Sequence, residues 1–341
     1  MTPFLRLTRP INLLIIAATM LLMREGVIAG NLERGIGELL KEAGPGVTRG
    51  ELLLPESFGP RMPWGHFILL VLSTVLVAAG GNVINDYFDT RIDRINKPGE
   101  VIVGRQVKRR VAMVGHLVLS GAGLLAGILV AWRSGLPQWM LITVFAIGAL
   151  WTYSTTFKRR LLIGNGLVAT LTALVPLTVG LYEIPLLKRA FAEPQVVALP
   201  DGSRYLMEPA FDQLWAWILA FTAFAFLSTL VRELQKDMAD EKGDREEGCR
   251  TVPIAWGMGA ARTMVLVYIG LLIAGLLVLR ARLLTDSVSF WYIGLGIIAP
   301  LLLSAGFTFQ ARTRDAHIRA GQLMKLAMVM AVGYALLIGR T

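Results

Sequence analysis

The sequence is short of the residues that build disulfides and soft metal clusters. It has 341 residues but a single cysteine, Cys249, which excludes an internal disulfide and a cysteine-based metal cluster. The three histidines, His66, His116 and His317, are scattered without metal-ligand spacing. The period-two alternation of a membrane β-barrel is absent as well.

Charge is also sparse, whereas long apolar runs are abundant. Charged residues make up 17% of the chain and hydrophobic residues 55%, with a mean hydropathy of +0.59. The apolar residues form uncharged blocks of about 20 residues, which match the thickness of a bilayer core when they are helical. We predict an all-α polytopic membrane protein with one domain over residues 1–341. The nine expected spans are 10–29, 66–85, 110–131, 139–157, 163–183, 213–231, 262–280, 288–309 and 321–339.

Two polar segments, at about 30–65 and 184–212, are expected to be extramembrane insertions. The stretch NLERGIGELLKEAG in the first insertion predicts a short amphipathic helix. The chain starts with basic residues and a short apolar run, as a signal peptide does, but no convincing small-residue cleavage site follows. The start is therefore predicted to be the first transmembrane helix.

Basic residues are unevenly shared between the two sides of the predicted membrane. The side that holds the N-terminus carries 22 of the 34 Lys and Arg residues, while the 24 acidic residues are split evenly. By the positive-inside rule this side is cytoplasmic, in a plasma or inner membrane. Topology and anionic lipid headgroups explain the net charge of +10, so the charge does not indicate nucleic-acid binding.

Carboxylates gather where the second predicted span ends, in the stretch NDYFDTRID at 85–93. If the helix continues past the membrane boundary, Asp89 and Asp93 share a face, with Asn85 one turn earlier. Asp86 then lies on the flank of that face. A second cluster, Asp237, Asp240 and Asp244, follows the sixth span in a similar pattern.

The second cluster is expected to leave its helix at Gly243, so that Asp244 hangs from a turn. Carboxylates on one face repel each other unless a cation lies between them. Mg²⁺ takes oxygen ligands and shares the oxygens of substrate phosphates. Two clusters on the same side of the membrane therefore predict one shared metal–diphosphate site. Nearby cations suit an anionic ligand, and they are Lys97, Arg105, Lys158, Arg159, Arg160, Arg232 and Lys236.

These stretches resemble a known family. NDYFDTRID and KDMADEKGD resemble the two aspartate-rich motifs of the UbiA-type intramembrane prenyltransferases, and GCRTVPI resembles the segment after the second motif. YSTTFKRRLLIGN at 153–165 is similar to the family's Tyr-Ser…Lys loop. RLTRPINLL is similar to its N-terminal entry through Arg9, Pro10 and Asn12. The similarity covers most of the chain, apart from the two insertions.

The resemblance implies nine helices around an apolar chamber with a lateral opening, in which Mg²⁺ and the diphosphate of an isoprenyl donor are held. The donor and a lipophilic acceptor would be the partners, with membrane lipid around them and no obligate protein partner. The residues aligned with metal-facing positions are Asn85, Asp89, Asp93, Asp237, Asp240 and Asp244. Asp89, Asp93, Asp237 and Asp240 are the expected catalytic residues. The expected substrate-binding residues are Arg9, Asn12, Asn85, Asp86, Lys97, Arg105, Tyr153, Ser154, Lys158, Arg232 and Lys236. For Tyr153 and Ser154, a buried packing role is the alternative.

Two acceptors stay open on this reasoning. The sequence of residues 85–110 is most similar to the geranylgeranylglycerol-phosphate geranylgeranyltransferase group of ether-lipid synthesis, although it departs from the family pattern after INKP. An aromatic acceptor of quinone synthesis, such as 4-hydroxybenzoate, homogentisate or a naphthoate, is the alternative. Arg9, Lys158 and Arg159 could bind an acceptor's phosphate or its carboxylate. In another class, the clusters would belong to a transporter gated by divalent ions.

Overall fold

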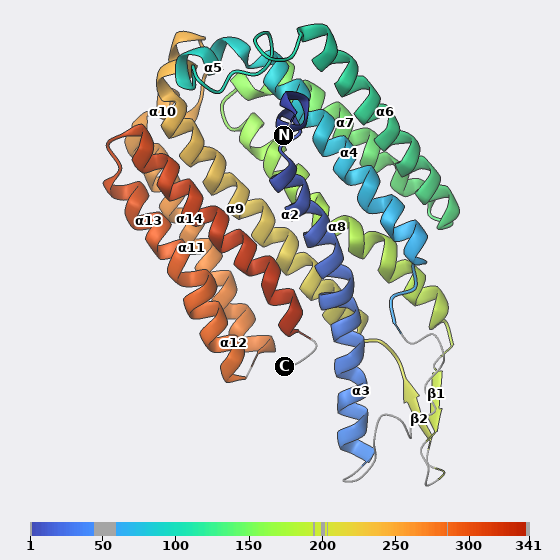
Figure 1. The fold of residues 1–341 in the computed structure, drawn as a ribbon. Helices are drawn as coiled ribbons and strands as arrows, with labels where there is room; N and C mark the ends of the chain where they lie inside the picture. Colours follow the sequence, from blue (N-terminus) through green and yellow to red (C-terminus); the bar gives the residue numbers. More distant parts are fainter. Residues whose placement is uncertain are drawn as a thin grey trace.

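The computed structural model describes residues 2–43, 59–193, 195–198, 202, 204–284 and 286–338. The helices lie side by side in one bundle (Figure 1). They are α1 (Pro3–Leu7), α2 (Pro10–Leu22), α3 (Gly30–Ala43), α4 (Trp64–Phe88), α5 (Thr90–Asn96), α6 (Arg109–Arg133), α7 (Met140–Thr155), α8 (Ile163–Ala190), α9 (Phe211–Glu246), α10 (Val252–Ala255), α11 (Gly257–Leu283), α12 (Ser287–Trp291), α13 (Ala299–Gln310) and α14 (Arg314–Gly333). The prediction of an all-α membrane fold is confirmed.

Eight helices in the described part of the chain are long and apolar enough to cross a membrane. Three of them are composite. The π-helical turns at Met23–Ala29 and Tyr292–Ile298 join α2 to α3 and α12 to α13, and a 3₁₀ turn at Tyr334–Leu337 extends α14. The predicted span that is not among these eight, 139–157, corresponds to α7. This helix has 16 residues, so it is only about 24 Å long. Short 3₁₀ turns at Pro137–Trp139 and Phe157–Arg159 take up the remaining residues of that apolar block.

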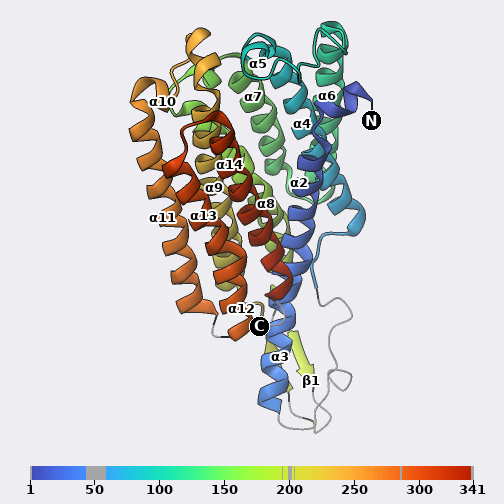
Figure 2. The same cartoon turned by 60° about the vertical axis from the view of Figure 1, so that its left-hand side comes forward.

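The first insertion begins as helix. The predicted amphipathic helix is α3, which continues the first span and projects beyond the other helices (Figures 1 and 2). Residues 44–58 of this insertion lie outside the described residues. The second insertion contains an antiparallel pair of strands that the sequence analysis missed, β1 (Gln195–Ala198) and β2 (Arg204–Met207). Strands of four residues are too short to show a clear alternation.

Small residues bring α4 and α6 close together. A Cβ at Gly123 would lie 2.7 Å from a methyl group of Val77 and 3.1 Å from the backbone oxygen of Ser73. The Ser73 hydroxyl donates a hydrogen bond to the Gly123 carbonyl at 2.7 Å. This packing gives the bundle a firm wall behind the cavity described below.

A buried ion pair fastens the end of the bundle near α3. Glu183 of α8 is fully buried, and it accepts hydrogen bonds from Arg24 Nε at 2.7 Å and from the backbone N–H groups of Arg61 at 2.8 Å and Met62 at 3.0 Å. The Arg24 guanidinium lies 4.3 Å from the ring centre of Trp64. The segment that enters α4 is thereby fixed to α8. We call this region the anchored end.

Candidate active site

The first aspartate motif spans the junction between α4 and α5. Asp89 caps α4, yet the helical pattern of backbone hydrogen bonds continues, from Asp89 N–H to the Asn85 carbonyl at 2.9 Å and from Asp93 N–H to the Asp89 carbonyl at 2.8 Å. The Asn85 amide donates to Asp89 Oδ2 at 2.7 Å. The predicted common face of Asn85, Asp89 and Asp93 is therefore present.

Cations from two other segments contact this motif. Arg9, which lies between α1 and α2, donates to Asp86 Oδ1 at 2.6 Å. Lys158, just after α7, forms an ion pair with Asp89. Burial disfavours the charge of each cation, but the neighbouring carboxylates outweigh it and raise the pKa of both Arg9 and Lys158.

The second motif lies on one uninterrupted helix. The prediction that Gly243 breaks the helix is wrong, because α9 continues through it to Glu246. Asp237 accepts a hydrogen bond from the Asn165 amide at 2.8 Å. Asp240 lies 3.6 Å from the guanidinium of Arg314, at the start of α14.

Gly243 is the point at which the two motifs meet. Asn96, the last residue of α5, accepts a hydrogen bond from Gly243 N–H at 3.1 Å and donates to the Asp240 carbonyl at 3.3 Å. A Cβ on Gly243 would lie 2.5 Å from Asn96 Oδ1 and 2.6 Å from its Nδ2. Only glycine leaves room for this contact, which ties α5 of the first motif to α9 of the second. We call this region of the bundle the aspartate end.

The donor atoms at the aspartate end suit a hard divalent cation. Asn85 Oδ1 and Asp240 Oδ1 are buried without a hydrogen-bond partner, and the residues Asp89 and Asp244 are only 5% and 6% exposed. Burial, with Asp89 adding to it, raises the pKa of Asp93. Across the described residues, no three or more His, Cys, Asp or Glu side chains already converge as a metal cluster. The oxygens are therefore available, but they are not yet gathered around one point.

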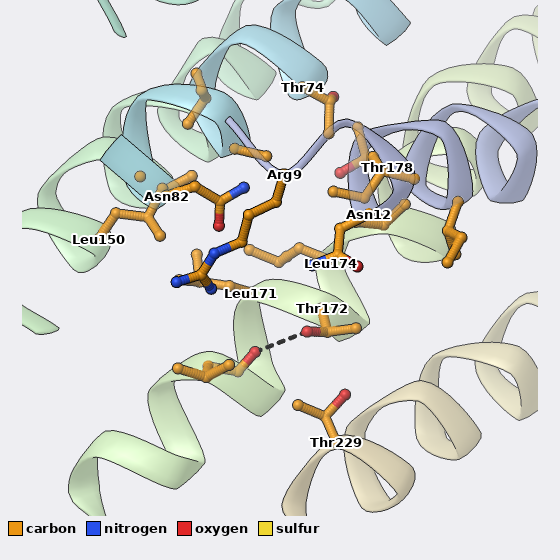
Figure 3. Close-up of a pocket in the computed structure, with 18 of the residues that line it drawn as sticks. Arg9, Asn12, Thr74, Asn82, Leu150, Leu171, Thr172, Leu174, Thr178 and Thr229 are labelled. Atoms are coloured by element: carbon orange, nitrogen blue, oxygen red, sulfur yellow. Dashed lines mark hydrogen bonds between the residues drawn. The ribbon is translucent and has the colours of Figure 1, made fainter. Parts of the chain in front are cut away.

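An apolar cavity of about 320 Å³ begins beside these motifs and runs between α2, α4, α7, α8, α9 and α14. Leu150, Leu171 and Leu174 line it together with several threonines (Figure 3). The hydroxyl of Thr172 donates to the Val168 carbonyl of its own helix at 3.0 Å. Because such a bond satisfies the hydroxyl within the helix, Thr172 adds little polarity to the wall.

The structure places only part of the predicted substrate-binding set in this cavity. The members that line it are Arg9, Asn12, Asn85, Tyr153, Arg232 and Lys236. Ser154 does not line it, and its hydroxyl donates to the Leu150 carbonyl at 2.9 Å. Lys97 and Arg105 lie outside it too, and Arg105 contacts the Pro98 carbonyl at 2.7 Å. For Ser154 the packing alternative therefore fits better.

Sequence reasoning missed Lys325, Glu233, Asn96 and Asn165. Lys325 and Glu233 both line the cavity, and Lys325 is the only charged residue in the predicted span 321–339. An ionisable residue inside a span is a recognised sign of a functional site, so this residue could have been found. Asn96 and Asn165 contact residues of the second motif that are 147 and 72 positions away, respectively, so no local sequence pattern predicts these contacts.

Residues 57–329 match the sequence profile of the UbiA prenyltransferase family. The match covers most of the chain and both aspartate motifs. The chain belongs to the UbiA prenyltransferase family. It is therefore a membrane enzyme that transfers prenyl groups. This result favours the predicted enzyme over the transporter alternative.

Relatives and solved structures agree with this assignment to the UbiA family. The digeranylgeranylglyceryl phosphate synthase of Thermococcus kodakarensis is 31% identical over 78% of this chain and 82% of the relative. The enzyme of the same name from Methanopyrus kandleri is 30% identical over 84% and 90%. The apo structure of a UbiA homolog from Aeropyrum pernix K1 has a TM-score of 0.59 at 15% identity, over 93% and 98% of the two chains.

A UbiA homolog from Archaeoglobus fulgidus bound to GPP and Mg²⁺ has a TM-score of 0.54 at 16% identity, over 98% of this chain and 99% of that one. Because the identities to both solved structures are low, their likeness to this chain shows only that the fold is shared. Divalent metal binding is a property of that neighbouring protein.

Proposed function

We propose that this enzyme transfers a geranylgeranyl group from geranylgeranyl diphosphate to geranylgeranylglyceryl phosphate, forming an ether. The observation that carries the proposal is the apolar cavity that begins beside two linked aspartate motifs. Such a site suits a substrate with a charged head and a long apolar tail. The names of relatives that cover most of the chain support the choice of acceptor.

Mg²⁺ is the proposed cofactor, and the buried oxygens of Asn85 and Asp240 that lack a hydrogen bond support it. The residues that would hold it are Asn85, Asp89, Asp93, Asp237, Asp240 and Asp244. The chemistry that a bound Mg²⁺ supplies is neutralisation of the leaving diphosphate.

The protein's own residues would do the remaining work. Lys158 and Arg9, which border the first motif, would contact the donor diphosphate as its charge develops. The apolar wall would exclude water, which would otherwise capture the allylic cation. The allylic C–O bond of the donor breaks, an ether C–O bond to the acceptor hydroxyl forms, and the hydroxyl proton leaves with the diphosphate product.

We also propose that the aspartate end faces the cytoplasm, in a plasma or inner membrane. Its loops, together with the N-terminus, carry 22 of the 34 basic residues. The positive-inside rule supports this orientation, which would place the diphosphate site on the side where soluble metabolites and Mg²⁺ are present.

The test uses full-length protein in detergent with Mg²⁺ and geranylgeranyl diphosphate. Geranylgeranylglyceryl phosphate and 4-hydroxybenzoate are offered in parallel, and the products are read by mass spectrometry. An ether product that requires Mg²⁺ is expected. A prenylated benzoate as the preferred product would move the enzyme to quinone synthesis and overturn the proposed acceptor.

A further inference from the structure

The cations around the cavity differ in whether a carboxylate neutralises them. Arg9 is paired with Asp86, and Lys158 with Asp89. These two cations were the ones expected to bind an acceptor phosphate, together with Arg159, and of the three only Arg9 lines the cavity. Because Arg9 and Lys158 are the cations proposed above for the donor diphosphate, an acceptor headgroup needs positive charge from another part of the wall.

That charge is present on α9 and α14. Arg232 lies 3.0 Å and Lys236 3.8 Å from the carboxylate of Glu233, so two cations share one anion. Lys325 donates to Asn12 Oδ1 at 3.1 Å, and within the described chain no carboxylate is in ion-pair range of it. These four side chains sum to +2 on the cavity wall. Lys236 is also near Asp240, so the charge that lacks a carboxylate is that of Lys325.

An uncompensated charge of this size is costly in an apolar wall. Arg232 and Lys325 carry like charges and line the same cavity, and Arg232 Nε is buried without a hydrogen-bond partner. An anion between the two side chains would remove the repulsion and supply the missing acceptor. A phosphate monoester carries about −1.5 to −2 charges near pH 7, which matches the excess, whereas a benzoate carries only one.

The place of this group also fits an acceptor. Asn12 follows Arg9 by three residues at the start of α2, so the contact with Lys325 lies about 5 Å along the helix from the residue that touches the first motif. The free hydroxyl of a glyceryl phosphate lies within a few bonds of its phosphate. A phosphate bound here would therefore bring that hydroxyl towards the allylic carbon of a donor held at the aspartate motifs.

We infer that Lys325, Arg232 and Asn12 form the binding site for the phosphate monoester headgroup of the acceptor lipid. The inference rests on the proposed function, and it assigns the donor diphosphate and the acceptor phosphate to different cations. The donor diphosphate contacts Lys158 and Arg9 at the first motif, and the acceptor phosphate contacts the wall formed by α9 and α14.

The experiment measures binding without turnover. Isothermal titration calorimetry in detergent, without Mg²⁺ or donor, follows geranylgeranylglyceryl phosphate, the neutral geranylgeranylglycerol and 4-hydroxybenzoate. Lys325→Gln is expected to raise the Kd of the phosphate lipid by about tenfold, the worth of one charged hydrogen bond. The Kd of the neutral lipid should stay unchanged, and Lys325→Arg should retain most of the affinity for the phosphate lipid.

Two further variants keep the test decisive. Asn12→Asp leaves the lysine in place but gives it a carboxylate partner, so it should weaken phosphate binding even if Lys325→Gln does not fold. Arg319→Gln is the matched control, because it removes a charge from an exposed position of α14 that does not line the cavity. Equal loss of phosphate and neutral lipid in Lys325→Gln, or preference of the wild type for the benzoate, would overturn the inference.

Turnover separates this inference from the proposed function. Lys325-dependent binding of the phosphate lipid without formation of an ether would keep the headgroup site and overturn the proposed acceptor. Formation of the ether with unchanged phosphate-lipid affinity in both Lys325→Gln and Asn12→Asp would keep the acceptor and overturn the site.

Discussion

The two ends of the bundle both bury carboxylates, but they satisfy them differently. At the anchored end, Glu183 receives three hydrogen bonds with both of its oxygens. At the aspartate end, Asp89 is bonded through Oδ2, and Asp240 Oδ1 is buried without a hydrogen bond. A carboxylate that is fully satisfied by the protein has no capacity left for a ligand. The incomplete satisfaction at the aspartate end is what a binding site requires.

The cations differ in the same sense. Arg24 is planar, is buried to 3% exposure, and lies against the rings of Trp64 and Phe67. Lys158 is a point charge on a flexible stem, and 17% of its side chain is exposed. A lysine of this kind can leave Asp89 for an incoming phosphate, whereas Arg24 cannot leave its position without unpacking two aromatic rings.

The largest effect is expected from removing single carboxylates at the aspartate end. Asp89→Ala or Asp237→Ala should lower Mg²⁺-dependent release of diphosphate by about a thousandfold, because each removes a proposed metal ligand. Release is measured with geranylgeranyl diphosphate, and folding is followed by thermal unfolding. Both variants should stay folded, although Asp89→Ala should be the less stable of the two because it leaves Lys158 without its ion-pair partner. Unchanged release in both variants would contradict the metal site.

A smaller loss is expected from Gly243→Ala, which tests the contact between the motifs. The new Cβ would overlap the Asn96 amide at 2.5–2.7 Å and push α5 away from α9. A displacement of about 1 Å can cost a hundredfold in rate, so kcat should fall by about that factor. Gly259→Ala in α11 is the control, because nothing lies within 4 Å of its Cβ. Equal rates in the two variants would show that the contact does not position the motifs.

Glu183→Gln, at the anchored end, is expected to lower the stability of the protein while leaving its rate nearly unchanged. The amide cannot neutralise Arg24, and breaking a buried pair costs about 3–5 kcal/mol, so the thermal unfolding temperature in detergent should fall clearly. The rate per folded molecule should stay near that of the wild type, since Glu183 lies outside the cavity lining. An active-site effect with unchanged unfolding temperature would remove the distinction between the two ends.

Local periodicity was enough to predict much of the aspartate end. Asn85, Asp89 and Asp93 share a face because residues four apart on a helix do so, and the hydrogen bonds continue across the junction of α4 and α5. The same reasoning failed at Gly243. Glycine costs a helix interior about 1 kcal/mol, but that cost is outweighed here by a contact with Asn96, 147 residues away.

The pairing of charges is the part that sequence could not give. Arg9 with Asp86, Lys158 with Asp89 and Arg24 with Glu183 are separated by 77, 69 and 159 positions. The sequence therefore predicted that cations surround an anionic ligand, but it could not say which of them are already neutralised. That distinction depends on tertiary packing, and it moves the expected acceptor site from Arg9 and Lys158 to Lys325.

The smallest expected effect is on the chemical labelling of Cys249, which lies beyond the second motif. Its labelling rate reports whether the loop after α9 closes the aspartate end. Cys249 follows a run of charged residues in the sequence, yet the residue is 3% exposed, and burial raises the pKa of Cys249 to about 11. Because only the thiolate reacts, maleimide labelling should be slow near pH 7 and should accelerate as the pH rises towards that value.

The chain has one cysteine, so labelling reports this position alone, and Cys249→Ser gives the background. Since the Cys249 N–H donates to the Asp244 carbonyl at 2.8 Å, labelling that is slower than the thiolate fraction alone predicts would mean that the loop around the end of α9 stays closed. The substrates would then have to reach the aspartates through the cavity. Rapid labelling at pH 7 would instead show that the loop opens, and that the second motif, unlike the anchored end, is accessible from the aqueous side.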